Sequence, residues 1–309
     1  METINAVPPG TVIHLPAEDG LSLAAEMRGP ADGCPVLFAH GFGQNRKMWA
    51  RTAASIAGQG WRTITFDARG HGGSGRVPDG AYHLEQFVTD LLTVVRSLGE
   101  PPVMVGHSMG GLLAMVAAGE VRPSPFRALV LVDITPRWEA SGVERILGFM
   151  RAHRDGFVSL EDAARQVAAY EPQRPRRRGV AELAQLLRRG DDGRWRWRWD
   201  PALLDTIAVE GERHQPRLIE DARNIDVPVL LVSGGRSDVV SDRTVAEFLR
   251  NVPDARHVEV PEATHAVAGD DNNAFTAAIA SFLKSVDSAP SRKDGGRRDA
   301  RQTAAGAPS

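Results

Sequence analysis

A short apolar strand that runs directly into a serine between glycines is the feature that most constrains this chain. Residues 103–105 are apolar, residues 106–111 read Gly-His-Ser-Met-Gly-Gly, and the apolar stretch 112–118 predicts a buried helix. A strand that turns straight into a helix holds the residue between them in a tight, strained turn, where flanking glycines leave room for the two backbones. We therefore expect the hydroxyl of Ser108 to project above the sheet, beside the free N–H groups of the helix N-terminus.

The rest of the chain alternates between apolar strands and helical stretches. Near-continuous apolar runs of this kind are typical of a parallel sheet that is buried on both faces, so the sequence predicts an α/β protein with a mostly parallel, doubly wound sheet. Strands are expected at 12–15, 21–27, 35–39, 62–66, 103–105, 128–134, 227–232 and 257–260, and helices at 48–57, 84–98, 112–118, 241–251 and 273–285.

One long segment interrupts this alternation. Between residues 135 and 223 there is no clear buried strand, and helical periodicity appears at 143–153, 160–170, 180–189 and 203–212. The sequence thus predicts a core over 1–134 and 224–286, separated by an insertion over 135–223. Residues 287–309 are rich in Pro, Gly, Ser, Ala and Arg and predict a disordered tail.

Two further glycine-rich loops follow predicted strands. Residues 40–43 read His-Gly-Phe-Gly, about 65 residues before Ser108, and residues 67–72 read Asp-Ala-Arg-Gly-His-Gly. With the serine turn, these motifs resemble the α/β-hydrolase superfamily, in particular capped serine hydrolases of the esterase and cofactor-free haloperoxidase-like branch. The resemblance implies an α/β-hydrolase fold in which the insertion forms a helical cap over the active-site end. A serine at this position argues against the dehalogenase and epoxide hydrolase branches, which use an aspartate.

A serine hydroxyl needs a base to take its proton and a carboxylate to orient that base. In the superfamily these residues follow in the order serine, acid, histidine. The resemblance places the base at His265, in the loop after the last strand. Two aspartates at strand ends satisfy the order: we favour Asp238, after the penultimate strand, and Asp133, after the strand that follows Ser108, is the alternative.

Acyl transfer also creates an oxyanion that needs hydrogen-bond donors. The backbone N–H of Met109 is one candidate, and the resemblance implies the N–H of Phe42 as the second. His40 and His71 lie in glycine-rich loops and are expected to be structural, and His107 is expected to pack or hydrogen-bond near the site.

Several other classes of protein lack support in the sequence. The phosphate-binding motif Gly-x-x-x-x-Gly-Lys-Ser/Thr is absent, and no Gly-x-Gly-x-x-Gly directly follows the first strand. No His/Cys/Asp cluster shows metal-ligand spacing, so neither cofactor nor metal is expected. The net charge of −2 gives no reason to expect nucleic acid as a partner. No apolar run is long enough for a membrane span, and the first residues do not resemble a signal peptide. A small-molecule substrate and a cytoplasmic location are expected; Cys34 is expected to pack, and the oligomeric state is open.

The insertion contains the unusual run Arg194-Trp195-Arg196-Trp197-Arg198-Trp199. In an extended segment this alternation places the indoles on one side and the guanidinium groups on the other. A membrane- or nucleic-acid-binding patch is conceivable, but we favour an extended segment whose Trp side packs inward on the insertion helices. The arginines of residues 174–178 are expected to lie in a solvated loop.

These features together predict a cofactor-free serine hydrolase that cleaves a small carboxylic ester or lactone through an acyl-enzyme on Ser108. The resemblance leaves two alternatives within enzymes, namely hydrolysis of carbon–carbon bonds in ring-opened aromatic compounds and perhydrolase or haloperoxidase-like activity. A slow-turnover ligand sensor that keeps the hydrolase fold is a third alternative. The sequence does not identify the substrate.

Overall fold

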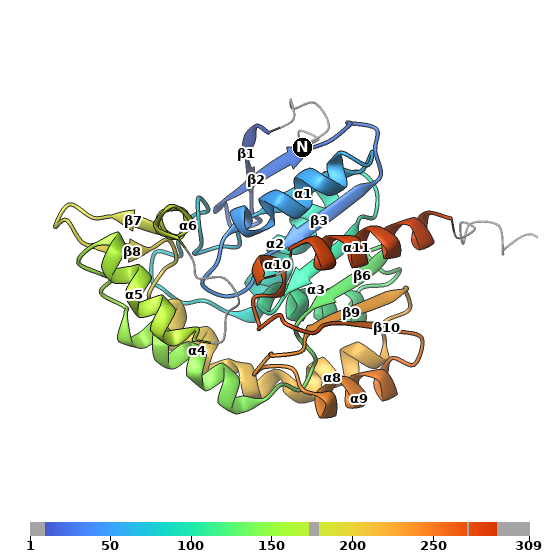
Figure 1. Ribbon diagram of the computed structural model, residues 1–309. Coiled ribbons are helices and arrows are strands. Elements are labelled where there is room, and N and C mark those ends of the chain that lie inside the picture. Colours follow the sequence, from blue (N-terminus) through green and yellow to red (C-terminus); the bar gives the residue numbers. More distant parts are fainter. Residues whose placement is uncertain (1–9, 173–178, 271, 289–309) are drawn as a thin grey trace, which may run out of the picture.

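The computed structural model describes residues 10–172, 179–270 and 272–288 (Figure 1). Its centre is an eight-stranded sheet in the order β1-β2-β4-β3-β5-β6-β9-β10, in which β2 pairs antiparallel with β1 and β4, and the other neighbours are parallel. All eight expected strands are present, with ends shifted by no more than two residues. They are β1 (Val12–Pro16), β2 (Ser22–Arg28), β3 (Pro35–Ala39), β4 (Arg62–Phe66), β5 (Val103–His107), β6 (Ala128–Val132), β9 (Val229–Gly234) and β10 (Arg256–Val260).

Both faces of the sheet are buried, as the continuous apolar runs predict. In β3, Leu37 and Ala39 belong to one apolar cluster, whereas Val36 and Phe38 belong to another on the opposite face. Successive side chains of a strand point to opposite faces, so each strand supplies both cores at once. The fold is therefore an α/β structure with a mostly parallel, doubly wound sheet.

Helices cover each face of the sheet. Helices α1 and α11 lie together on one face, where residues of both pack into the second cluster. Helices α2, α3, α8 (Gln215–Arg223) and α9 supply the first cluster on the other face (Figure 1). The helices outside the insertion are η2 (Arg46–Trp49), α1 (Ala50–Ala57), α2 (Leu84–Ser97), α3 (Met109–Glu120), α9 (Asp242–Asn251), α10 (Val267–Asp270) and α11 (Asn272–Asp287).

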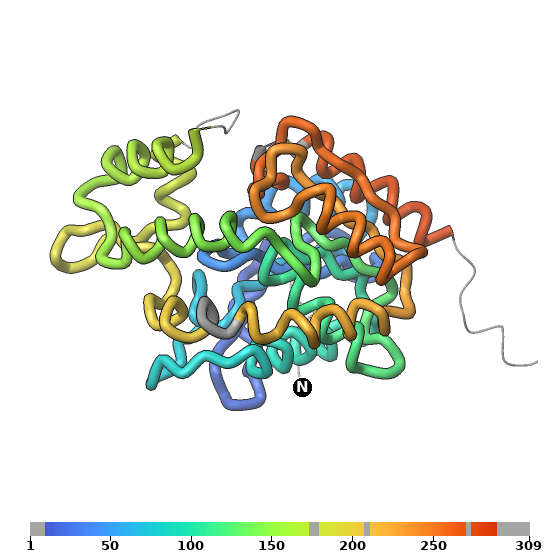
Figure 2. The backbone as a smooth tube through the Cα atoms, turned by 90° about the horizontal axis from the view of Figure 1, so that it is seen from below, coloured from blue at the N-terminus to red at the C-terminus, as the bar shows by residue number. Residues whose placement is uncertain are grey.

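The chain between the neighbouring strands β6 and β9 is mainly helical. A part of it, containing α5, α6, β7 and β8, projects to one side of the sheet in both views (Figures 1 and 2). The elements of this segment are α4 (Ala140–Ala152), α5 (Leu160–Tyr170), α6 (Val180–Leu186), β7 (Leu187–Arg189), β8 (Trp195–Trp197), α7 (Leu203–Glu210), η3 (Gly211–His214) and α8 (Gln215–Arg223).

Two of these elements differ from the sequence-based expectation. The helix expected over 180–189 ends at Leu186, because the next three residues pair with β8 as an antiparallel hairpin. Helix α8 was not expected; Pro216 occupies its first turn, and Leu218 and Ala222 are buried against the core. Pro is well accepted in a first turn, where its missing N–H has no helical partner.

The hairpin contains the alternating Arg-Trp run, and its indoles point inward as expected. Trp195 and Trp197 pack on a small cluster around Phe157, and Trp199 is buried in the main core. On the outer side, the guanidinium group of Arg196 pairs with Asp192. The alternation is thus explained by packing on one side and solvation on the other.

Main-chain hydrogen bonds join the end of this run to the core loop at residues 70–72. The N–H of Gly72 donates to the carbonyl of Arg198, and the N–H of Asp200 donates to the carbonyl of Gly70, both at 2.7 Å. The hydroxyl of Tyr82 donates to Asp200 at 2.8 Å. We call residues 198–200, which make this connection, the strap.

Some predicted features fall outside this description. The arginines at 174–178 and the tail residues 289–309 lie outside the described residues. Among the residues that are described, no helix combines the length and the apolar character needed to cross a membrane. Cys34 is half-buried beside the second cluster, in keeping with a packing role.

One buried carboxylate lies where α8 packs on α3. The side chain of Asp221 is only 5% exposed, and the nearest cationic atom, Nε of Arg217, is 4.0 Å away. Burial, with a smaller contribution from the charge of Glu120, raises the pKa of Asp221 to about 6. The folded protein therefore holds this proton to a higher pH than the unfolded chain does.

Replacing Asp221 by Asn is expected to stabilise the protein at neutral pH. As pH rises from about 4 to about 6, the unfolded chain loses the proton first, so the contribution of Asp221 to the free energy of unfolding falls and then levels off. The Asn variant does not lose this stability. Its free energy of unfolding should therefore exceed that of the parent by on the order of 1–2 kcal/mol above pH 7, and by little below pH 4. Urea unfolding of the variant and the parent, below pH 4 and at pH 8, measures the difference in their free energies of unfolding. A variant less stable than the parent at pH 8 would contradict the expectation. Asp254→Asn, at an exposed carboxylate, is the control.

Candidate active site

The turn at Ser108 has the strained geometry that its glycines predict. Ser108 lies between β5 and α3 with φ 49° and ψ −118°, a left-handed conformation that non-glycine residues rarely adopt. A Cβ on Gly106 would lie 2.5 Å from the carbonyl oxygen of Gly110, and one on Gly110 would lie 2.6 Å from that of Ala39. The close approach of these backbones therefore requires glycine, and it places the serine at the N-terminus of α3.

His265 and Asp133 form a hydrogen-bonded pair beside this turn. Nδ1 of His265 lies 2.7 Å from Oδ2 of Asp133, and the histidine side chain is 18% exposed. The aspartate side chain is fully buried and also accepts hydrogen bonds from the N–H of Gly234 at 2.8 Å and from the hydroxyl of Ser237 at 2.5 Å. A buried carboxylate is tolerated when hydrogen bonds replace its contacts with water in this way. The bond from Asp133 to Nδ1 also orients the ring of His265, so that Nε2 faces away from Asp133.

Asp238, the acid favoured by the sequence, does not occupy this position. Its carboxylate pairs with Arg145 of α4 at 2.5 Å and is 32% exposed. After β9 ends, a turn closed by the N–H of Ser237 and the carbonyl of Gly234 directs Ser237, rather than its neighbour, toward Asp133. The expected pairing of Asp238 with His265 is therefore replaced by that of the alternative, Asp133.

The loop at residues 40–43 is pressed against the serine turn. A Cβ on Gly41 would lie 2.5 Å from Nδ1 of His107 and 3.2 Å from Cβ of Ser108. The backbone of this loop thus passes the serine turn so closely that a side chain at position 41 would force it to move. Phe42, whose N–H is one expected oxyanion donor, follows directly, and Met109, the other, begins α3.

Two buried histidines hold this loop in place. Nε2 of His40 accepts from the N–H of Ala68 at 3.0 Å, and its Nδ1 lies 2.8 Å from the carbonyl oxygen of Gly41. Nε2 of His71 accepts from the N–H of Gly43 at 3.1 Å, and its Nδ1 lies 3.0 Å from the carbonyl oxygen of Arg69. These partners assign the ring proton to Nδ1 in both histidines.

Burial favours the neutral form of both rings. It lowers the pKa of His40, and it lowers the pKa of His71 to about 3. Neutral rings keep Nε2 as an acceptor, so the structural role expected for the two histidines agrees with their contacts. His107 has a related role: its Nε2 lies 2.8 Å from the carbonyl oxygen of His265 and so fixes the loop that carries this residue.

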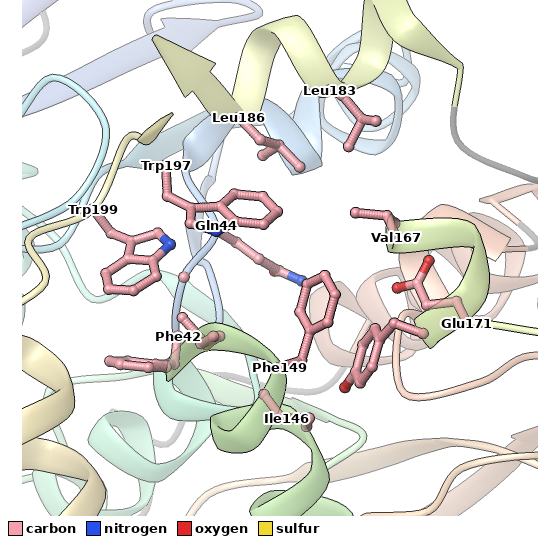
Figure 3. A pocket seen from close by; sticks show the side chains of 13 residues that line it. Phe42, Gln44, Ile146, Phe149, Val167, Glu171, Leu183, Leu186, Trp197 and Trp199 are labelled. Atoms are coloured by element: carbon pink, nitrogen blue, oxygen red, sulfur yellow. The ribbon is translucent and has the colours of Figure 1, made fainter. Parts of the chain in front are cut away.

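A cavity of about 490 Å³ opens at Ser108 and His265. Part of its wall comes from α4 and from the end of α5, including Arg145 and Tyr170. A smaller apolar pocket of about 100 Å³ adjoins it (Figure 3). The two share Phe42, Gln44, Ile146, Tyr170 and Glu171 in their walls.

A serine in a strained turn, beside a histidine that is bound to a buried carboxylate, is the arrangement found in serine hydrolases. Residues 35–271 match the family model described as the α/β-hydrolase fold. The chain therefore belongs to the α/β-hydrolase family, as its sequence motifs predict.

Known proteins similar to this chain include enzymes of several kinds. A 3-hydroxybutyrate-oligomer hydrolase of Cupriavidus necator is 30% identical over 77% of this chain and 84% of its own length. An esterase of Mycobacterium tuberculosis is 31% identical over 80% of this chain and 82% of its own length. The crystal structure of an E-2-(acetamidomethylene)succinate hydrolase superposes with a TM-score of 0.77 at 26% identity, covering 89% of this chain and all of that one.

Replacing Gly41 by Ala is expected to lower activity sharply while leaving the fold intact. The added Cβ must displace the loop from His107 and Ser108, and a displacement of about 1 Å at a reacting centre can cost up to about a hundredfold in rate. Hydrolysis of nitrophenyl butyrate by Gly41→Ala should fall at least about tenfold. Gly148→Ala in α4, where an added Cβ meets nothing within 4 Å, is the matched control and should retain activity. Equal activity of the two variants would refute the expected close approach.

Proposed function

We propose that this chain is a serine hydrolase that cleaves a small carboxylic ester or lactone through an acyl-enzyme on Ser108. Its relatives at 30–31% identity include an esterase and an oligomer hydrolase, and the chain is, like them, a carboxylesterase-like hydrolase acting on ester bonds. The observation that carries the mechanism is the 2.7 Å contact between His265 and the buried Asp133, in a cavity that also exposes Ser108.

In the first half of the proposed reaction, the oxygen of Ser108 attacks the ester carbonyl carbon and His265 takes the hydroxyl proton on Nε2. The carboxylate of Asp133 stabilises the positively charged ring, which it already holds through Nδ1. The developing oxyanion accepts hydrogen bonds from the N–H groups of Phe42 and Met109, each worth about 3 kcal/mol in comparable sites. The carbon–oxygen bond to the alcohol then breaks, and the alcohol leaves with the proton from His265.

The second half repeats these steps with water. His265 takes a proton from water, the resulting hydroxide attacks the acyl-enzyme, and Ser108 leaves with the proton returned by the ring. The product is the carboxylic acid. For a lactone the same steps open the ring, and the alcohol stays attached to the product.

Removal of the nucleophile tests this proposal most directly. Ser108→Ala is expected to lose hydrolysis of nitrophenyl acetate and butyrate by on the order of a thousandfold or more, and to lose covalent labelling by a fluorophosphonate. Mass spectrometry of the labelled parent protein should place the adduct on Ser108. Unchanged turnover by the variant, or an adduct on another residue, would disprove the acyl-enzyme on Ser108.

The acid is tested by a matched pair of substitutions. Asp133→Asn keeps the shape of the side chain but removes the charge that faces Nδ1, so kcat is expected to fall by about a thousandfold or more. Asp238→Asn removes an ion pair with Arg145 on the wall of the cavity and is expected to cost less than about tenfold, as exposed pairs contribute little. The same ester assay measures both, and the reverse ranking would restore Asp238 as the acid.

A further inference from the structure

Four hydrogen bonds meet at Ser237, in the turn that follows β9. Its hydroxyl donates to Oδ2 of Asp133 at 2.5 Å. Its side-chain oxygen accepts from the N–H groups of Val239 and Val240 at 3.2 and 3.1 Å, and its own N–H donates to the carbonyl of Gly234 at 3.0 Å. The side chain is therefore held by its own loop while it contacts a residue 104 positions earlier in the chain.

The direction of the hydrogen bond between Ser237 and Asp133 follows from the other contacts of the hydroxyl. A serine oxygen carries one proton and two lone pairs. The N–H groups of Val239 and Val240 occupy the lone pairs, so the single proton is left for the carboxylate. Accepting these bonds also polarises the hydroxyl and strengthens it as a donor. The contact is thus a directed hydrogen bond from Ser237 to the buried carboxylate.

This hydrogen bond ends on the same carboxylate oxygen that contacts His265. Oδ2 of Asp133 lies 2.7 Å from Nδ1 of the ring, whereas Oδ1 accepts from the N–H of Gly234. A carboxylate can rotate about its Cβ–Cγ bond, and a fixed donor on each oxygen prevents this rotation. Without the hydroxyl of Ser237, the position of Oδ2 would depend on the same ring that this oxygen has to orient.

The backbone of Asp133 makes this support more important. Its φ is 49°, in the left-handed region that residues other than glycine rarely adopt. Such a conformation persists where the surrounding contacts over-determine it. Gly234, Ser237 and His265 supply such contacts to the side chain. Among these three partners, Ser237 is the side chain that is not itself assigned a step in the proposed reaction.

We propose that Ser237 is a positioning residue: its hydroxyl holds the carboxylate of Asp133 in the rotation that directs Oδ2 at Nδ1 of His265. This inference rests on the proposed ester hydrolysis, in which the carboxylate stabilises the charged ring. Ser237 does not line the catalytic cavity, although its neighbours Arg236 and Asp238 do. Its contribution is therefore to the rate of the chemical steps and not to the binding of substrate.

Replacing Ser237 by Ala tests this role. The variant should lower kcat for nitrophenyl butyrate by roughly tenfold to a hundredfold, as expected for the loss of a hydrogen bond to a charged group. KM should stay within about threefold of the parent value, because the cavity wall is retained. Ser237→Thr keeps the hydroxyl and should recover most of the lost rate. A parent-like kcat in Ser237→Ala, or a loss that appears in KM instead, would overturn the proposal.

Ser241→Ala is the matched control for effects on the fold. Ser241 is the N-cap of α9, four residues after Ser237, where its side chain accepts from the N–H of Thr244 and donates to Glu139. Loss of a cap lowers the thermal midpoint of unfolding, but this serine does not contact Asp133. The control should therefore keep the parent kcat. An equal loss of kcat in both alanine variants would show that the rate follows the stability of this segment, against a positioning role.

The proton between His265 and Asp133 provides a readout that does not require catalysis. A proton on Nδ1 that is held by a carboxylate resonates far downfield in the ¹H NMR spectrum, and its loss in Asp133→Asn assigns it. In Ser237→Ala this resonance should move upfield or broaden, because the carboxylate is no longer fixed. In Ser241→Ala it should stay unchanged. A lowered kcat with an unchanged resonance in Ser237→Ala would mean that the serine acts elsewhere, and would overturn the proposal.

The outcomes separate this inference from the proposed function. If Ser108→Ala abolishes hydrolysis while Ser237→Ala leaves both kcat and the resonance unchanged, the positioning role alone is overturned. Hydrolysis that survives Ser108→Ala would instead overturn the proposed function, and the resonance would still report on the contact between Asp133 and His265. Thermal unfolding of each variant shows whether a lost rate comes from a disturbed fold.

Discussion

The buried carboxylate of Asp133 joins parts of the chain that lie far apart in the sequence. It follows β6, accepts from Gly234 at the end of β9 and from Ser237 just after it, and holds His265 in the loop after β10. A charge with no exposed surface is tolerated only if all of these partners are in place, so the ends of three neighbouring strands are fixed relative to one another. The position of the histidine is therefore a property of the sheet and not of its loop alone.

A second constraint is the close approach of backbones around Ser108, and it connects the site to the insertion. The loop that carries Phe42 passes the serine at Gly41, and the N–H of Gly43 is held by His71. The residue after His71 is in turn hydrogen-bonded to Arg198 of the strap. A continuous series of contacts thus runs from the Arg-Trp hairpin to the expected oxyanion donor, and the buried, neutral His71 is part of it.

The sequence was sufficient for the sheet and the serine turn, because both depend on local patterns: apolar runs of strand length and glycines at fixed spacing. It was insufficient for the acid, because Asp133 and Asp238 both follow strands that end at the same edge of the sheet, about 5 Å apart. Which one reaches His265 depends on the turn at Ser237. The β7 strand was missed because Leu187 to Arg189 continue a helical pattern and pair only through β8.

The strap uses only main-chain atoms where it meets the loop at residues 70–72. This attachment is consequently independent of which side chains residues 194–199 carry, whereas two of those side chains, Trp197 and Trp199, form part of the wall of the smaller pocket beside the catalytic cavity. Substitutions along the hairpin can therefore change what the pocket accepts without releasing the hairpin from the core. In a family whose members act on many compounds, such a separation lets substrate range diverge while the catalytic geometry is inherited unchanged.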